Sequence, residues 1–152
     1  MRPLKLELEG FSAFRERTEV DFADTELFVL TGATGSGKSS LIDAMTFALY
    51  GSVPRYDDKR LVAPVITQGK NEARVRLDFA LGQTEYTAVR VVRRTASGAT
   101  TKETRLERGK EVLADNPDAV SEAVTRLLGL DFDQFTRCVV LPQGDFAEFL
   151  HD

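Results

Sequence analysis

The sequence predicts one domain of the α/β class, with a strand, loop and helix unit beside an antiparallel sheet. Two observations carry this prediction. A glycine-rich loop at residues 32–39 separates an apolar run at 27–30 from a helix-like apolar pattern, and residues 73–79 alternate strictly between apolar and polar. The 152-residue length suits one compact domain, and the 42% hydrophobic and 29% charged fractions are typical of globular proteins. We therefore assign residues 1–152 to one domain.

The first elements are strands. Leu4, Leu6 and Leu8 alternate with charged residues, as expected of a half-buried strand, and residues 18–22 form a second short strand that pairs with the first as a hairpin. The continuous apolar run at 27–30 is typical of a strand buried on both faces. This buried strand leads directly into the glycine-rich loop.

A helix follows the loop. Apolar residues recur at helical spacing from Leu41 to Leu49, and Gly51 is expected to end the helix in the left-handed conformation. Residues 52–70 contain Pro54 and Pro64 and show no clear period, which predicts a loop.

The second half is predicted to be an antiparallel meander followed by a helix. Strands are expected at 73–79, 85–94 and 101–108, with turns at Gly82 and Ser97-Gly98. Asn116 before Pro117 predicts a helix start, and that helix ends near Gly129. A strand-like stretch at 138–141 precedes Pro142, and a further helix is expected from 145 to 150.

The motif GATGSGKS, from Gly32 to Ser39, matches the phosphate-binding loop pattern G-x-x-x-x-G-K-[ST] at every fixed position. Glycines let successive N–H groups turn towards phosphates, and a helix start adds its positive dipole end. Lys38 is expected to reach the β and γ phosphates, and the Ser39 hydroxyl to hold Mg²⁺. The candidate nucleotide-binding residues are Ala33, Thr34, Gly35, Ser36, Gly37, Lys38, Ser39 and Ser40.

The motif leaves the reaction open, because kinases, GTPases and several ATPase classes share it. Hydrolysis normally needs an acidic Mg²⁺ partner at the end of an apolar strand. No apolar run in this sequence ends in adjacent carboxylates. The sequence therefore predicts nucleotide binding without efficient hydrolysis by this chain alone.

Three other functions remain as alternatives. A small nucleotide or metabolite kinase has a suitable length, but such kinases are mostly parallel sheets and have no place for the meander. A GTPase is disfavoured because no N-K-x-D string occurs. A nucleotide-regulated binding module without chemistry of its own is the third alternative.

The segment from Arg90 to Lys110 has seven basic and two acidic residues, a local charge of +5, which leaves −9 for the rest of a chain of net charge −4. This asymmetry is consistent with contacts to DNA phosphates through Arg93, Arg94, Lys102 and Arg105. A solvated basic edge of a sheet is the alternative. Because the sequence has no zinc-finger or helix-turn-helix pattern, any such contact should be independent of base sequence.

No apolar run approaches the roughly 20 residues that span a bilayer, and the N-terminus lacks a signal-like stretch, so a cytoplasmic protein without membrane contact is expected. The single cysteine, Cys138, lies in an apolar stretch and is expected to be buried packing. No metal cluster or thiol chemistry is predicted.

Four segments together resemble the N-terminal ATPase lobe of the SbcC family, the coiled-coil DNA-repair ATPases related to structural-maintenance-of-chromosomes (SMC) proteins. They cover both ends of the chain in the family's order. The segments are LELEGFSAF with TEVDF, TGATGSGKSSLIDAMTFALYG, ITQGKNEARVRLDF and FTRCVVLPQGDFAEFL. The last resembles the family's Q-loop, whose glutamine is Gln143 here.

The resemblance implies an ABC-type head that binds ATP and Mg²⁺. In such a head Gln143 contacts Mg²⁺ and the attacking water, so Lys38 and Gln143 are the expected catalytic residues. Ser12 and Arg15 are expected near the nucleotide, whereas Phe11 and Phe14 are expected to be core aromatics.

The resemblance also implies what completes the head. The family's second lobe follows a long coiled coil, expected to begin at Asp152, and supplies the signature motif and the acidic pair. Implied partners are that C-terminal lobe, a second head in an ATP-dependent homodimer, an SbcD-type nuclease, and DNA. By this resemblance, ATP is expected to clamp the heads together and hydrolysis to release them during processing of DNA double-strand breaks.

Overall fold

The computed structural model describes residues 1–22, 35–53 and 65–138, and for residues 35–40, 137 and 138 it describes the backbone only. Six strands and three helices lie within these residues. The strands are β1 (Arg2–Glu9), β2 (Thr18–Asp21), β3 (Glu72–Leu81), β4 (Thr84–Thr95), β5 (Gly98–Arg108) and β6 (Glu111–Ala114). The helices are α2 (Gly35–Tyr50), α3 (Pro117–Leu128) and α4 (Phe132–Cys138).

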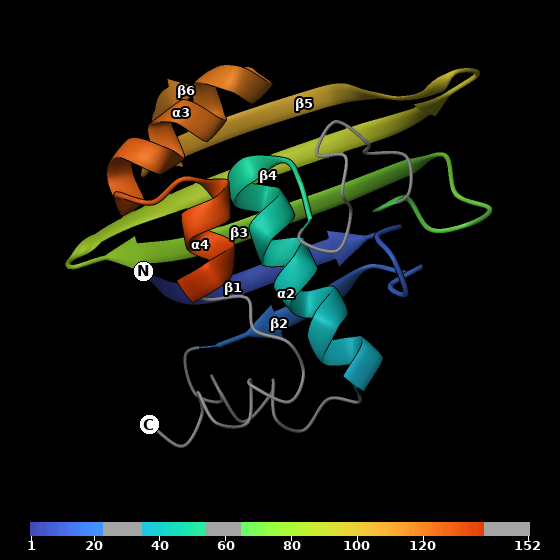
Figure 1. Ribbon diagram of the computed structural model, residues 1–152, viewed down its shortest axis with the longest axis horizontal. Helices are drawn as coiled ribbons and strands as arrows, with labels where there is room; N and C mark the ends of the chain where they lie inside the picture. Colours follow the sequence, from blue (N-terminus) through green and yellow to red (C-terminus); the bar gives the residue numbers. More distant parts are fainter. Residues whose placement is uncertain (23–34, 54–64, 139–152) are drawn as a thin grey trace.

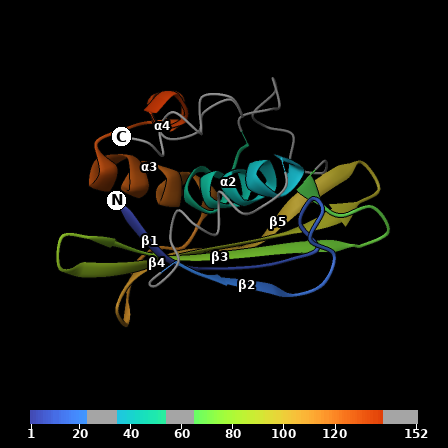
Figure 2. The same cartoon turned by 90° about the horizontal axis from the view of Figure 1, so that it is seen from below.

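The described strands form one six-stranded sheet in the order β2-β1-β3-β4-β5-β6, and every neighbouring pair is antiparallel. Helices α2, α3 and α4 lie on one side of this sheet (Figures 1 and 2). We call that side the helix face and the opposite side the open face. The fold is therefore mixed α/β, as the sequence predicts.

The core lies between the helix face and α2, and the period of two in the strands places it there. In β1 and β3 the paired residues Leu6 with Leu77, and Leu8 with Val75, are all almost fully buried. Phe47 of α2 packs against Phe11, with ring centroids 5.6 Å apart. Burying one such side chain contributes roughly 1.5–3 kcal/mol, so this layer supplies most of the driving force for the fold.

The predicted hairpin, meander and capped helix are confirmed. β1 and β2 pair antiparallel, and β3, β4 and β5 follow one another with turns at Gly82 and at Ser97. The Asn116 side chain accepts a hydrogen bond from the backbone N–H of Ala119 at 2.9 Å, and Gly129 ends α3 in the left-handed conformation. Gly51 ends α2 in the same way, with φ 77°.

Two described elements were not predicted, β6 and α4. Cys138 ends α4 instead of beginning a strand, so the strand assignment at that residue is wrong. The physical reason is a reciprocal cap: the Asp131 carboxylate accepts from Gln134 N–H, and the Gln134 side chain accepts from Asp131 N–H. The predicted strands at 27–30 and 139–141 and the helix at 145–150 lie outside the described residues.

Candidate functional site at the two ends of helix α2

Helix α2 begins at Gly35, inside the phosphate-binding motif, and its first turn contains no acidic residue. The first N–H groups of a helix have no partner within the helix, and they sit at the positive end of its dipole. Gly35 and Gly37 have no side chain that could cover the backbone at their own positions. The N-terminal end of α2 is therefore chemically suited to an anion such as phosphate.

The structure brings part of the predicted nucleotide site together on this helix. The first residues of α2 are the candidates Gly35, Ser36, Gly37, Lys38, Ser39 and Ser40. Ala33, Thr34 and Gln143 lie outside the described residues.

The turn between β1 and β2 holds the candidates Ser12 and Arg15, and both views place it at the same end of the molecule as the start of α2 (Figures 1 and 2). Ser12 has φ 52°, and its N–H donates to the Val65 carbonyl at 2.7 Å. The Arg15 guanidinium donates to the Gln68 carbonyl at 3.1 Å. The turn is thereby fixed to residues 65–68.

The expected core role of the two aromatics in this turn is confirmed. Phe11 is fully buried, and Phe14 packs partly buried against the same core. The backbone at Gly10 lies close against β3. A Cβ there would stand 2.3 Å from the Glu72 carbonyl oxygen, so only glycine fits at this position.

Arg90 of β4 holds the other end of α2. Its Nε donates to the Ala48 carbonyl at 3.1 Å and its Nη2 to the Leu49 carbonyl at 3.0 Å. Helix α2 has no basic residue in its own last turn, so Arg90 provides the cation that complements the negative end of the dipole. Burial lowers the pKa of Arg90 to about 10, and the bonds to these carbonyls offset that cost.

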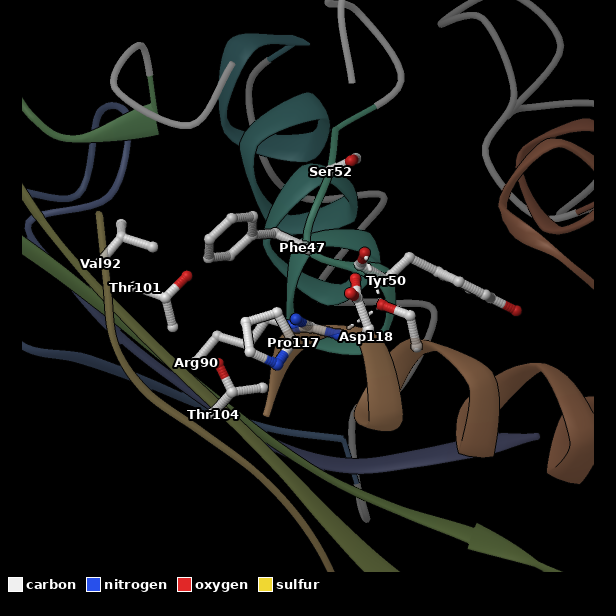
Figure 3. A pocket seen from close by; sticks show the side chains of 11 residues that line it. Phe47, Tyr50, Ser52, Arg90, Val92, Thr101, Thr104, Pro117 and Asp118 are labelled. Atoms are coloured by element: carbon white, nitrogen blue, oxygen red, sulfur yellow. Dashed lines mark hydrogen bonds between the residues drawn. The ribbon is translucent and has the colours of Figure 1, made fainter. Parts of the chain in front are cut away.

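A cavity of about 290 Å³ is lined in part by Arg90, at the junction of α2, α3, β4 and β5 (Figure 3). Ser121 of α3 accepts from Arg90 Nη2 at 3.1 Å and donates to the Tyr50 carbonyl at 3.1 Å. Thr104 also lines the cavity, and its hydroxyl is buried with no hydrogen-bond partner within the described part of the chain. The cavity lies where the end of α2 meets the sheet and α3.

The predicted DNA-contacting residues divide between the two faces of the sheet. Arg93 and Arg105 pair in register with open-face positions, and the Lys102 ammonium reaches Glu72 on that face. Arg94 follows Arg93 in the strand and points to the helix face, where it donates to the carbonyls of Lys70 and Ile66. Three of the four cations therefore share the open face, where Arg93 and Lys102 meet at Glu72, and Arg94 binds carbonyl groups of residues 66 and 70 on the helix face.

Sequence reasoning missed Arg90 as a structural residue, because it counted all seven basic residues of 90–110 as one surface. The signal was present: Arg90 stands in the apolar run from Ala88 to Val92, where a cation needs a buried partner. Within 1–22, 35–53 and 65–138, no cluster of three metal-ligating side chains occurs, and no helix is long and apolar enough to cross a membrane.

A complete phosphate-binding motif at the start of a helix that packs on an antiparallel sheet is typical of the fold class of ABC-type ATPase heads. The chain belongs to the AAA domain family, whose model matches residues 5–152. It is 46% identical to the SbcC component of the nuclease SbcCD from Deinococcus radiodurans over 99% of its length, and 38% identical to the probable DNA double-strand break repair Rad50 ATPase of Aquifex aeolicus over 100%. These similarities confirm the resemblance to the SbcC family.

A solved structure agrees on the fold. It comes from work on ATP-driven dimerization and DNA-stimulated activation of SMC ATPases, with a TM-score of 0.62 at 22% identity over 99% of this chain and 91% of that one. The chain spans 17% of the Deinococcus relative and 15% of the Aquifex relative. It therefore corresponds to one part of those longer proteins.

Proposed function

We propose that residues 1–152 form the N-terminal ATP-binding lobe of the head of a coiled-coil DNA double-strand-break repair ATPase. The observation that carries the proposal is the position of α2, which begins inside a complete phosphate-binding motif and has no carboxylate in its first turn. The names of the relatives, a component of a nuclease and a Rad50 ATPase, support the repair role.

In this proposal the residues at the start of α2 bind the triphosphate. Lys38 binds the β and γ phosphates, Ser39 and Gln143 hold Mg²⁺, and backbone N–H groups of residues 33–40 surround the phosphates. When bound, Mg²⁺ neutralises phosphate charge. The turn between β1 and β2, which carries Ser12 and Arg15, lies at this end of the molecule, and in the proposal these two residues contact the nucleotide.

The rest of the head completes the reaction. Because the sequence has no apolar run ending in adjacent carboxylates, a C-terminal lobe supplies the acidic groups that hydrolysis needs. ATP binding joins two such heads, and an SbcD-type nuclease uses the cycle on DNA ends. A small kinase is a poorer candidate because the described sheet is antiparallel throughout, and the described helices α2, α3 and α4 all lie on one side of it.

The test of the nucleotide site is calorimetric titration of Mg·ATP into the assembled head and its Lys38→Ala variant. Loss of a charge-assisted contact should cost about 1.5–3 kcal/mol of binding free energy. Lys110→Ala is the control, because Lys110 is exposed in the turn between β5 and β6. Equal ATP affinities for wild type and Lys38→Ala would refute the assignment.

The DNA part of the proposal rests on Arg93, Lys102 and Arg105, the three candidate cations that share the open face. If these three residues contact duplex phosphates, the logarithm of the DNA affinity of the ATP-bound head should fall linearly with the logarithm of the salt concentration. The three contacts should contribute about −2.7 to that slope. Replacing all three by Gln should flatten the slope by that amount and leave ATP affinity unchanged. If neither the DNA affinity nor its salt slope changes, these three residues do not contact DNA and are a solvated basic edge of the sheet.

A further inference from the structure

Two carboxylates on the open face each bridge two of its cations. Glu72 of β3 accepts from the Lys102 ammonium at 2.9 Å and lies 3.7 Å from the Arg93 guanidinium. Glu103 of β5 lies 2.6 Å from the Arg105 guanidinium and 3.6 Å from that of Arg74. All three proposed DNA-contacting cations are therefore already held by intramolecular anions.

The ion pairs of Glu72 are accessible to solvent. The side chains of Arg93 and Lys102 are 54% and 47% exposed, and that of Glu72 is 37% exposed. The hydrogen bond from Lys102 lowers the pKa of Glu72, so this carboxylate stays ionised near neutral pH. Exposed pairs of this kind are weak, so another anion can replace the carboxylate.

We infer that Glu72 and Glu103 set the affinity of this face for DNA by occupying the cations that phosphates would otherwise bind. A carboxylate and a phosphate use the same N–H donors of Arg and Lys, so the two anions compete. A displaced carboxylate stays within a Debye length of the bound phosphates and repels them. This inference rests on the DNA contact proposed above and adds the residues that limit its strength.

The experiment measures duplex DNA affinity of the ATP-bound assembled head by fluorescence anisotropy, for Glu72→Gln, Glu103→Gln and the double variant. Each single substitution should raise affinity roughly two- to fivefold, the range expected when one exposed pair is removed from competition. ATP affinity should not change. The gain should disappear when Arg93, Lys102 and Arg105 are all replaced by Gln.

The matched control is Glu19→Gln. Glu19 of β2 bridges two cations in the same manner, at 3.2 Å from Lys5 and 3.1 Å from Arg17, and it lies on the same open face but at the opposite edge of the sheet from β5. It changes net charge by the same amount, so an equal gain there would show a general charge effect and overturn the inference. Unchanged or weaker DNA binding in Glu72→Gln and Glu103→Gln overturns it as well.

The outcomes also separate this inference from the proposed function. If the triple Gln variant loses DNA affinity while the two Glu variants gain none, the DNA contact stands and the inference alone fails. If the Glu variants gain affinity even in the triple Gln background, the cations are not the competing groups and the inference fails. Loss of ATP binding in Lys38→Ala tests the nucleotide site independently of both.

Discussion

Arg90 keeps a positive charge in the interior by donating to the carbonyl oxygens that end α2. Its planar group reaches two successive carbonyls and the Ser121 hydroxyl at once, a geometry that a lysine ammonium cannot reproduce. Gly51 contributes by its lack of a side chain, because a Cβ there would stand 2.9 Å from Arg90 Nη1. One residue of the sheet thus fixes the end of the helix that begins at the phosphate motif.

Arg90→Met should destabilise the protein by about 1–3 kcal/mol, because it leaves buried carbonyl acceptors without a donor. Arg90→Lys should cost less, since it keeps the charge. The control is Arg93→Met, three positions along the same strand and half exposed, which should change the free energy of unfolding by less than about 0.5 kcal/mol. Denaturant unfolding measures all three, and equal losses for Arg90→Met and Arg93→Met would contradict the capping role.

Tyr50, which lines the same cavity as Arg90, should make the stability of the protein depend on pH. Burial, and then the nearby Asp131 charge, raise its pKa to about 12, and its hydroxyl donates to the Leu130 carbonyl at 2.6 Å. The pKa of Tyr50 in the folded protein lies above the ordinary value of about 10. The protonated Tyr50 hydroxyl therefore contributes fully to the free energy of unfolding below pH 10, and this contribution is lost as the pH rises towards 12.

In Tyr50→Phe the late step of the phenolate absorbance titration should be missing, and the fall in stability between about pH 10 and about pH 12 should be smaller. Unfolding measured at both ends of that range gives the comparison. If the late step remains and an earlier step is lost instead, another tyrosine produces the late step.

At the scale of elements, helix α3 depends on its cap. Asn116 satisfies an N–H group at the start of the helix, Pro117 occupies the first helical position, and Gly129 closes the other end. The buried residues Val120, Ala123 and Val124 then face the sheet. The cap fixes where the helix starts, and so places Ser121 beside Arg90.

Asn116→Ala should destabilise the protein by about 1 kcal/mol through loss of the cap, whereas Asn116→Gly should cost only a few tenths. Thermal unfolding of the two variants tests this order. If Asn116→Gly were the more destabilising substitution, backbone flexibility rather than the lost hydrogen bond would govern the start of α3.

At the scale of the whole molecule, we expect this chain alone not to turn over ATP, because in the proposed function another lobe supplies the acidic water-activating group. Phosphate release should be measured for the 152-residue chain with and without the C-terminal lobe. Turnover should require both. Robust turnover by the chain alone that is abolished by Lys38→Ala would revive the kinase or stand-alone ATPase alternative.

Local patterns were sufficient for much of this molecule. The alternation in β1 and β3, the glycine turns, the cap at Asn116 and the phosphate motif are each encoded within a few neighbouring residues. The short strand β6 and helix α4 were missed, although the Asp131 and Gln134 spacing was a usable capping signal. For the candidate site, local sequence supplied the motif and the order of elements around it.

The net effect of the charges required the tertiary structure. The +5 of residues 90–110 is a property of the sequence, but folding buries Arg90, directs Arg94 to carbonyls, and places Glu72 beside Arg93 and Lys102. Strand pairing joins residues far apart in the chain, and its register decides which charges become neighbours. The sequence therefore determined the phosphate motif and the elements around it, while only the tertiary structure decided which cations stay accessible.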